Sequence, residues 1–300
     1  MSHPCTPRTV ARLAPAVLLL MLTACTTPQG PAQGSGPADG PVKPKVDRLV
    51  FATEAPAREV NETRMLRTPN TWQYTPMYES LLGVEEKNGK RVPALATEWK
   101  VGADGSSYVF KLRKGVRFHT QTANGQGDWG EFTAKDLVLP YTEIAKRDSI
   151  SGVTAMWWGA VKSIEVVNDY EAIIHLARRD ANFIDYVSDQ LGGYEIWSTK
   201  AFEQLGAPTD VTKPALPGTG PYMYKDRAQN QFIRFAKVPY EHWKATPDFP
   251  EFEFRFIREA STRLAALLTG EAQMTPLPQD LLVQAQRQGF KLHTGTTPAY

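Results

Sequence analysis

The sequence predicts a layered fold that mixes sheets with helices, α/β or α+β, on two observations. Two hairpin patterns, with apolar residues at every second position, occupy 99–112 and 163–176. Three stretches with helical spacing of apolar residues occur at 132–147, 261–269 and 279–288. The mixture argues against an all-β sandwich, and the sequence contains no internal repeat.

The expected strands follow from short apolar runs and from alternation. Residues 48–53, RLVFAT, form an apolar run typical of a buried first strand. In the first hairpin Asp104 and Gly105 occupy the turn, and one face of the second strand is apolar. Residues 251–256, EFEFRF, alternate charged and aromatic side chains, which predicts a half-exposed strand.

The expected helices follow from caps and from spacing. Thr133 and Asp136 form the pattern of a capping box at the start of the helix at 132–147. Pro140 inside this stretch predicts a kink or a restart, because an interior proline costs about 3 kcal/mol. Gly270 and Gly289 are expected to end the two later helices. Residues 76–82 are also expected to be helical.

The amino-terminal residues 1–24 have the layout of a secretory signal peptide. Arg8 and Arg12 precede an apolar stretch at 13–22, which is too short to span a bilayer core that needs about 20 residues. Residues 22–25, LTAC, resemble a bacterial lipobox, which implies that Cys25 is acylated and becomes the mature amino terminus. Residues 25–45, rich in Pro and Gly, are expected to form a disordered tether.

Composition excludes several classes of function. The chain has 34 basic and 32 acidic residues, and loss of the two signal-peptide arginines leaves 32 of each. This balance argues against a nucleic-acid partner. Cys25 would be the only cysteine after cleavage, so no intramolecular disulfide is expected. The five histidines are too scattered for a metal site, no cofactor motif is present, and His119 and His175 are interpreted as structural.

Residues 92–119 have the sequence VPALATEWKVGADGSSYVFKLRKGVRFH. This segment resembles the signature of the family 5 extracellular solute-binding proteins of ABC importers, the oligopeptide-, dipeptide- and nickel-binding group. Five further segments match in the family's order: MYESLL (77–82), FTAKDLV (132–138), PGTGPY (217–222), VPYEHWK (238–244) and STRLAALLTGEAQM (261–274). PGTGPY is interpreted as a structural turn whose glycines allow a sharp bend.

The resemblance implies an α/β, periplasmic-binding-protein-like (type II) mixed-sheet lobe with an inserted smaller α+β domain. The lobe would comprise 46–82 and 198–300, and the inserted domain 83–197. Residues 120–131 are longer than the family's usual turn, so a surface loop is expected there. Family members look roughly twice as long, and we therefore expect an amino-terminal part in which the second main lobe is missing.

The implied function is that of a substrate-binding lipoprotein. It would be anchored outside the cytoplasm through Cys25 and would capture a small solute for ABC permease subunits, without catalysis. A short oligopeptide is the default solute, while sugars, opines and metal chelates stay open.

Aromatic side chains are the main candidates for solute contact. The adjacent Trp157 and Trp158 point in different directions on any regular element, so one of them is expected to line an apolar pocket wall. The alternative is one core residue and one rim residue. The resemblance adds Glu54, in the loop after the first strand, which could meet a peptide's amino group or a cation. Glu54 could equally be a solvated loop charge. Trp72 and Tyr78 are further candidates.

Two other functions stay open at this point. A lipid-anchored glycoside hydrolase would use the tryptophans as a sugar platform and needs a carboxylate pair about 5–9 Å apart beside Trp157 or Trp158. A truncated lipoprotein that binds a protein partner and no solute would expose an apolar patch.

Overall fold

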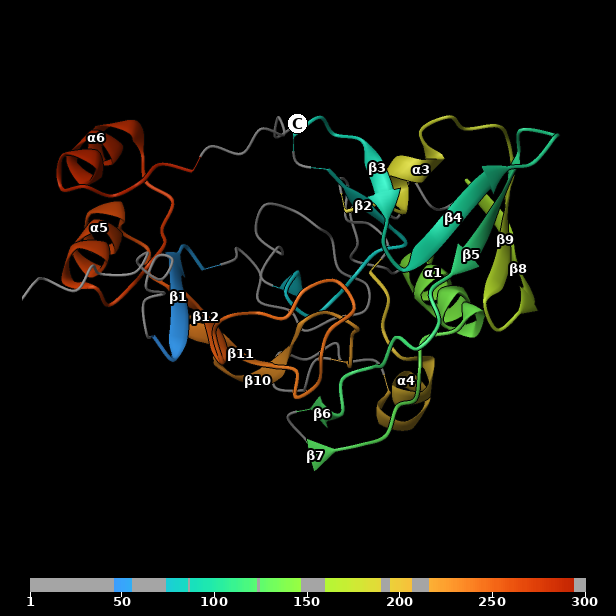
Figure 1. The fold of residues 1–300 in the computed structure, drawn as a ribbon, viewed down its shortest axis with the longest axis horizontal. Coiled ribbons are helices and arrows are strands. Elements are labelled where there is room, and N and C mark those ends of the chain that lie inside the picture. The colour runs from blue at the N-terminus through green and yellow to red at the C-terminus, as the bar shows by residue number, and fades with distance from the viewer. Residues whose placement is uncertain are drawn as a thin grey trace, which may run out of the picture. The chain divides into compact units, whose positions relative to one another are not determined.

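The computed structural model describes residues 46–55, 74–85, 87–122, 125–146, 160–189, 195–206 and 216–293. Two four-stranded sheets dominate this part of the chain (Figure 1). The first, here called the β1 sheet, has the order β1-β12-β11-β10. Its strands are β1 (Arg48–Thr53), β10 (Tyr222–Ala228), β11 (Phe232–Lys237) and β12 (Glu251–Phe256).

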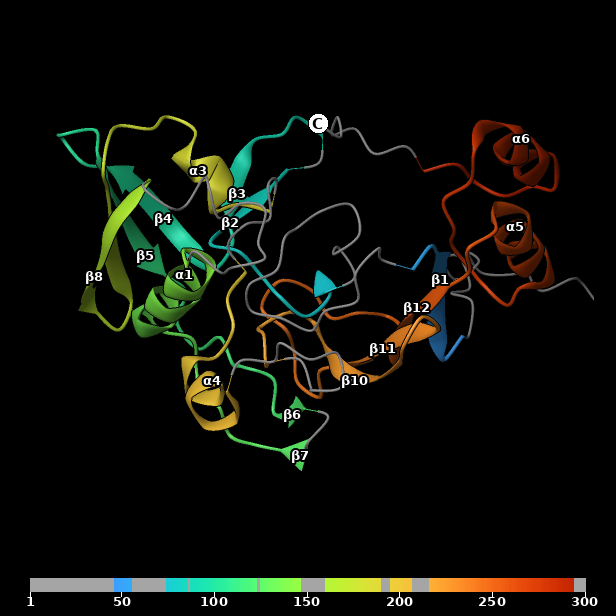
Figure 2. The same cartoon turned by 180° about the vertical axis from the view of Figure 1, so that it is seen from behind.

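The β1 sheet is mixed, because β1 runs parallel to β12 while β10, β11 and β12 pair antiparallel. Figures 1 and 2 both show α5 (Ala260–Thr269) and α6 (Gln279–Arg287) beside β1. Gly270 ends α5 in the left-handed conformation with φ 79°, as predicted. Helix α6 also lies at its predicted position.

The alternation in β12 divides the side chains of the β1 sheet between two environments. Phe254 joins a core cluster with Tyr74, Met77, Tyr224, Ile233 and Phe235. The intervening Glu253 was expected on an exposed face, yet its side chain is only 1% exposed. Arg48, Arg234 and Arg255 surround its carboxylate at 2.7–3.1 Å. A buried carboxylate is tolerated here because it is paired and hydrogen-bonded.

The second sheet, the β5 sheet, is an antiparallel arrangement in the order β4-β5-β9-β8. Its strands are β4 (Ala96–Val101), β5 (Ser107–Leu112), β8 (Val161–Asn168) and β9 (Glu171–Leu176). Both predicted hairpins are therefore confirmed. Gly105 adopts φ 68° in the first turn, a conformation that favours glycine.

The helical stretch after Phe132 is present, and its capping box is confirmed. The Thr133 N–H donates to Asp136 Oδ2 at 2.9 Å. A 3₁₀ turn, η2 (Ala134–Leu137), precedes α1 (Val138–Ile144), so the helix changes type at Val138 and not at Pro140. Pro140 consequently lies in the first turn of α1, where a missing N–H removes no intrahelical hydrogen bond.

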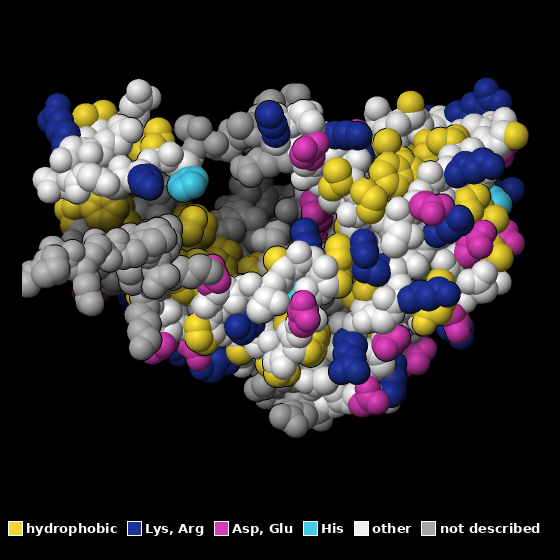
Figure 3. Space-filling view, viewed as in Figure 1, with side chains coloured by type: hydrophobic (Ala, Val, Ile, Leu, Met, Phe, Trp, Pro, Cys, Tyr) yellow, Lys and Arg dark blue, Asp and Glu magenta, His cyan; other side chains and the backbone are white. Residues whose placement is uncertain are grey.

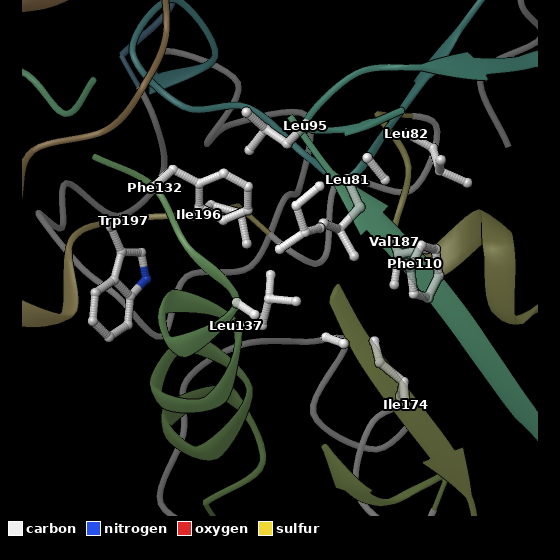
Figure 4. Close-up of a cluster of buried hydrophobic side chains, with 14 of the residues drawn as sticks. Leu81, Leu82, Leu95, Phe110, Phe132, Leu137, Ile174, Val187, Ile196 and Trp197 are labelled. Atoms are coloured by element: carbon white, nitrogen blue, oxygen red, sulfur yellow. The ribbon is translucent and has the colours of Figure 1, made fainter. Parts of the chain in front are cut away.

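The largest hydrophobic cluster packs the β5 sheet against η2 and the segments that flank it (Figure 4). Its fully buried members include Leu81, Leu95, Phe110, Phe132, Leu137, Ile174 and Ile196. Leu81 and Ile196 come from segments far apart in sequence. An isolated antiparallel bridge between Glu79 and Ile196 joins these two segments.

The prediction of a helix at 76–82 is wrong. Residues Tyr74–Met77 form a turn, and the chain is extended from Tyr78 into β2 (Leu82–Val84). The physical reason is tertiary, because the backbone groups of this segment bond to distant partners. The Gly220 N–H donates to the Met77 carbonyl, and the Ile196 N–H donates to the Glu79 carbonyl, both at 3.0 Å.

Smaller elements complete the described part of the chain: β3 (Arg91–Pro93), β6 (Gln121–Thr122), β7 (Gly125–Gln126), α3 (Phe183–Tyr186) and α4 (Thr199–Leu205). None of the described helices is long and apolar enough to cross a membrane. The division into a lobe and an inserted domain stays a prediction. The signal peptide, the tether and Cys25 lie outside the described residues.

Candidate functional site

Strand β1 has a parallel neighbour on each side, and the carboxyl-terminal ends of these segments lie at the same end of the β1 sheet. This end is here called the carboxyl edge of the sheet. Strand β1 lies between β12 and Met274, which forms a parallel bridge to Phe51. The Ala52 N–H donates to the Met274 carbonyl at 2.9 Å, and the Ile257 N–H donates to the Thr53 carbonyl at 2.7 Å. Ligands of open α/β sheets bind outside the carboxyl ends of the strands. This edge is therefore the candidate site.

Glu54 follows β1 directly and stands at this edge. Its side chain is 68% exposed, whereas the preceding Thr53 is buried. Glu54 Oε1 lies 3.4 Å from Arg263 Nη2 of α5. The structure thus places the predicted carboxylate at the strand ends with a cationic neighbour, and its contact with a solute stays a prediction.

Arg263 is a residue of this edge that sequence reasoning missed. Its side chain is 5% exposed, and Nη1 donates to the carbonyls of Ile257 and Arg258 at 2.9 and 2.7 Å. Nε donates to the Pro276 carbonyl at 3.3 Å. A signal was present, because Arg263 lies four residues before the buried Leu267 and so shares its helical face.

An open pocket of about 510 Å³ lies beside β1, and neither Glu54 nor Arg263 is among the residues that line it. Its walls come from Phe51, the segment 273–277, α5, α6 and the segment 290–293. Met274 and Leu292 are each more than 40% exposed, so the walls carry accessible apolar surface. Figure 3 shows hydrophobic side chains gathered beside α5 and α6. Over the β4, β5, β8 and β9 region the same view shows acidic and basic side chains interspersed.

Tyr78 lies in a different place from Glu54. It lines a pocket of about 280 Å³ together with Glu79, Asp189, Glu195 and Lys244, and Glu54 is not among the residues of that pocket. Its hydroxyl donates to the Leu216 carbonyl at 2.8 Å. Burial raises the pKa of Tyr78 well above its usual value, so the phenol stays neutral. The structure does not bring Tyr78 and Glu54 together, and its predicted solute contact is untested.

The GTG turn, Gly218–Gly220, needs glycine for a reason other than the predicted sharp bend. Neither glycine has a positive φ. An added Cβ at Gly218 would lie 2.0 Å from the Met77 carbonyl oxygen, and one at Gly220 would lie 2.5 Å from the Pro76 carbonyl oxygen. Close backbone approach, not turn conformation, therefore selects glycine at both positions.

His119 and His242 both contact the backbone of this turn. His119 Nε2 lies 2.8 Å from the Gly220 carbonyl, and the Gly218 N–H donates to His119 Nδ1 at 3.3 Å. Because a carbonyl only accepts, His119 carries its proton on Nε2. His242 Nε2 similarly lies 2.8 Å from the Thr219 carbonyl. Burial lowers the pKa of His119 to about 4, which keeps it neutral.

These contacts give His119 a structural role, while His175 pairs with Glu165 at 3.0 Å on the β5 sheet. Within the described ranges no three His, Cys, Asp or Glu side chains are grouped to hold a metal ion. Trp72, Trp157 and Trp158 lie outside the described residues. The carboxylate pair that a hydrolase would need beside the last two is therefore untested.

Comparison with known proteins gives consistent results. Residues 90–300 match the family model of bacterial extracellular solute-binding proteins, family 5, middle region. The chain is 28% identical over 231 residues to a probable di/tripeptide-binding protein 5 of Pseudomonas aeruginosa. That match covers 73% of this chain and 43% of the relative, so the chain spans less than half the length of that relative.

Solved structures show the same likeness. One is an ABC transporter-associated periplasmic binding protein from Helicobacter pylori in complex with the peptide STSA, with a TM-score of 0.68 and 25% identity over 80% of this chain and 48% of that one. A second is a dipeptide binding protein from Pseudoalteromonas sp. SM9913 in complex with Met-Leu, with a TM-score of 0.67, 25% identity and coverage of 80% and 49%. The predicted α/β fold class, that of a periplasmic-binding-protein lobe, is confirmed.

Proposed function

Because the chain belongs to the family 5 bacterial extracellular solute-binding proteins, we propose that it captures a short peptide for an ABC importer. The observation that carries this proposal is the carboxyl edge of the β1 sheet. There the exposed Glu54 carboxylate follows β1, and Phe51 of β1 and the parallel neighbour Met274 line an open, partly apolar pocket. A free peptide carries an ammonium group and apolar side chains, which match these two features.

The proposed mechanism is binding without bond-making. Such receptors work by closure around the solute, and the membrane permease subunits favour the closed form. The relatives described above are binding proteins, which favours this mechanism over glycoside hydrolysis. Opines, sugars and metal chelates are the competing solutes.

We also propose that the protein works outside the cytoplasm as a lipoprotein. The family is extracellular, and residues 22–25 have the lipobox pattern. Growth with a radiolabelled fatty acid should label the wild-type protein and should not label the Cys25→Ser variant. Label on that variant would contradict acylation at Cys25.

The peptide proposal is tested by isothermal titration calorimetry on the full chain with Met-Leu. We expect saturable binding with one site. Mass spectrometry of the solution in the calorimeter cell should show that the peptide is chemically unchanged. Mannopinic acid, a glucose oligomer and nickel–histidine serve as competing solutes. Binding of one of these without binding of Met-Leu or a tripeptide would refute the peptide assignment. Loss of Met-Leu over time would refute a non-catalytic mechanism.

A further inference from the structure

Glu79 and Glu253 are both buried glutamates, but only Glu253 has cationic partners. The side chain of Glu79 is 6% exposed and that of Glu253 is 1% exposed. Three arginines surround the Glu253 carboxylate at 2.7–3.1 Å. Glu79 has no Lys or Arg ion-pair partner among the residues that the structure describes. A carboxylate buried without a cation is unfavourable, because it loses its hydration without compensation.

The hydrogen bonds around His242 show that this neighbour of Glu79 is neutral. His242 Nε2 lies 3.6 Å from Glu79 Oε2 but 2.8 Å from the Thr219 carbonyl, so its proton is donated to that carbonyl. The Lys244 N–H donates to His242 Nδ1 at 3.3 Å, so Nδ1 carries no proton. The imidazole therefore brings no positive charge to Glu79.

The two carboxylate oxygens of Glu79 have different surroundings. The Trp243 indole N–H donates to Oε2 at 3.2 Å. Oε1 is buried and has no hydrogen-bond partner within the described part of the chain. Trp243 and His242, which lie near Oε2, do not line the pocket that Glu79 shares with Tyr78, so Oε1 is the oxygen left for that pocket.

The charged side chains of this pocket are mostly acidic. Its volume is about 280 Å³, and Glu79, Asp189, Glu195 and Lys244 are among the residues that line it. Three carboxylates therefore share the pocket with one ammonium group, which is not paired with Glu79. Tyr78 adds an aromatic wall, and aromatic faces attract organic cations. The volume lies below the range of about 300–1,000 Å³ that is typical of drug-sized ligands, so a ligand here is small.

We propose that this pocket binds a small aliphatic amine, as a ligand distinct from the transported solute. The ammonium group supplies the counter-charge that Glu79 lacks and an N–H donor for Oε1. The terminal torsion of a glutamate rotates readily, so Oε1 can turn toward an entering donor. Asp189 and Glu195 add negative charge for a second ammonium group, so a short diamine is the expected class.

Two observations define the scope of the inference. Within the described ranges no carboxylates are grouped to hold a metal ion, which favours an organic cation. The pocket shares no lining residue with the pocket beside β1, so the inference does not depend on the proposed function.

Isothermal titration calorimetry on the full chain with the diamine putrescine tests the site. Butanediol, in which hydroxyl groups replace both ammonium groups, is the matched uncharged probe. We expect saturable binding of putrescine with one site and no binding of butanediol. Glu79→Gln keeps the shape but removes the charge, and it should weaken putrescine at least about tenfold. Glu165→Gln, at an exposed pair with His175 on the β5 sheet, is the control and should leave the affinity unchanged.

Stability provides a second readout. Because Glu79 lacks a counter-charge, Glu79→Gln should unfold at the same urea concentration as wild type or at a higher one, whereas Glu253→Gln should unfold at a lower one. Putrescine should raise the wild-type midpoint and leave that of Glu79→Gln unchanged. Glu195→Gln tests the pocket through a second lining residue, and it should weaken putrescine severalfold.

Several results would overturn the inference. Equal binding of putrescine and butanediol would show that charge is not recognised. Heats that match those of sodium chloride at the same ionic strength, or an unchanged affinity in Glu79→Gln, would refute the amine site. A loss of stability in Glu79→Gln as large as that in Glu253→Gln would show that Glu79 already has a counter-charge. Displacement of putrescine by Met-Leu would refute a separate site, whereas failure of Met-Leu to bind would refute only the proposed function.

Discussion

We expect the buried His119 to make the stability of the protein depend on pH. His119 has a pKa of about 4 in the folded protein, because burial disfavours its charged form more than the hydrogen bond to the Gly220 carbonyl favours it. Its value in an unfolded chain is about 6.5. The unfolded state therefore binds the proton more readily, and stability falls as pH decreases from about 6.5 to about 4. At 1.36 kcal/mol per pKa unit, the total loss is about 3 kcal/mol.

Urea unfolding of wild type and His119→Gln at pH 7.5, 6.5, 5.5 and 4.5 measures this loss. Glutamine can keep one hydrogen bond to the turn but does not titrate, so the difference between the two proteins isolates His119. The free energy of unfolding of wild type should approach that of the variant as pH falls. His175→Gln, at a partly exposed surface pair, is the matched control. A constant difference across this pH range would refute the reasoning that burial holds His119 neutral.

Further predictions concern packing and charge. Gly218→Ala should lower the free energy of unfolding by about 3 kcal/mol, because its Cβ would overlap the Met77 carbonyl oxygen. Gly89→Ala, with φ 71° and open space around it, should cost only about 1 kcal/mol, and equal losses would contradict the close-approach argument. Glu253→Gln should destabilise by about 3 kcal/mol, because hydrogen bonds from its arginine partners hold the pKa of Glu253 below its usual range despite burial. Chemical denaturation checks each value, and Glu98→Gln, at an exposed pair, should leave stability unchanged.

Local signals in the sequence predicted those elements whose cause is local. The capping box of Thr133 and Asp136 is a contact between residues three apart, and the glycine after α5 acts within one turn. The alternation that predicted β5 and β9 depends only on neighbouring residues. The helix expected at 76–82 failed for the opposite reason, since its backbone partners Gly220 and Ile196 lie more than 100 residues away.

By itself, the sequence determined the fold class, the family and the position of Glu54 after a buried strand. The tertiary structure alone decided what Glu54 meets. Glu54 and Arg263 are 209 residues apart, and their contact depends on the parallel pairing of β1 with β12, which brings α5 to the end of β1. No propensity or spacing encodes that pairing, because it is set by which apolar faces pack together once the whole chain is folded.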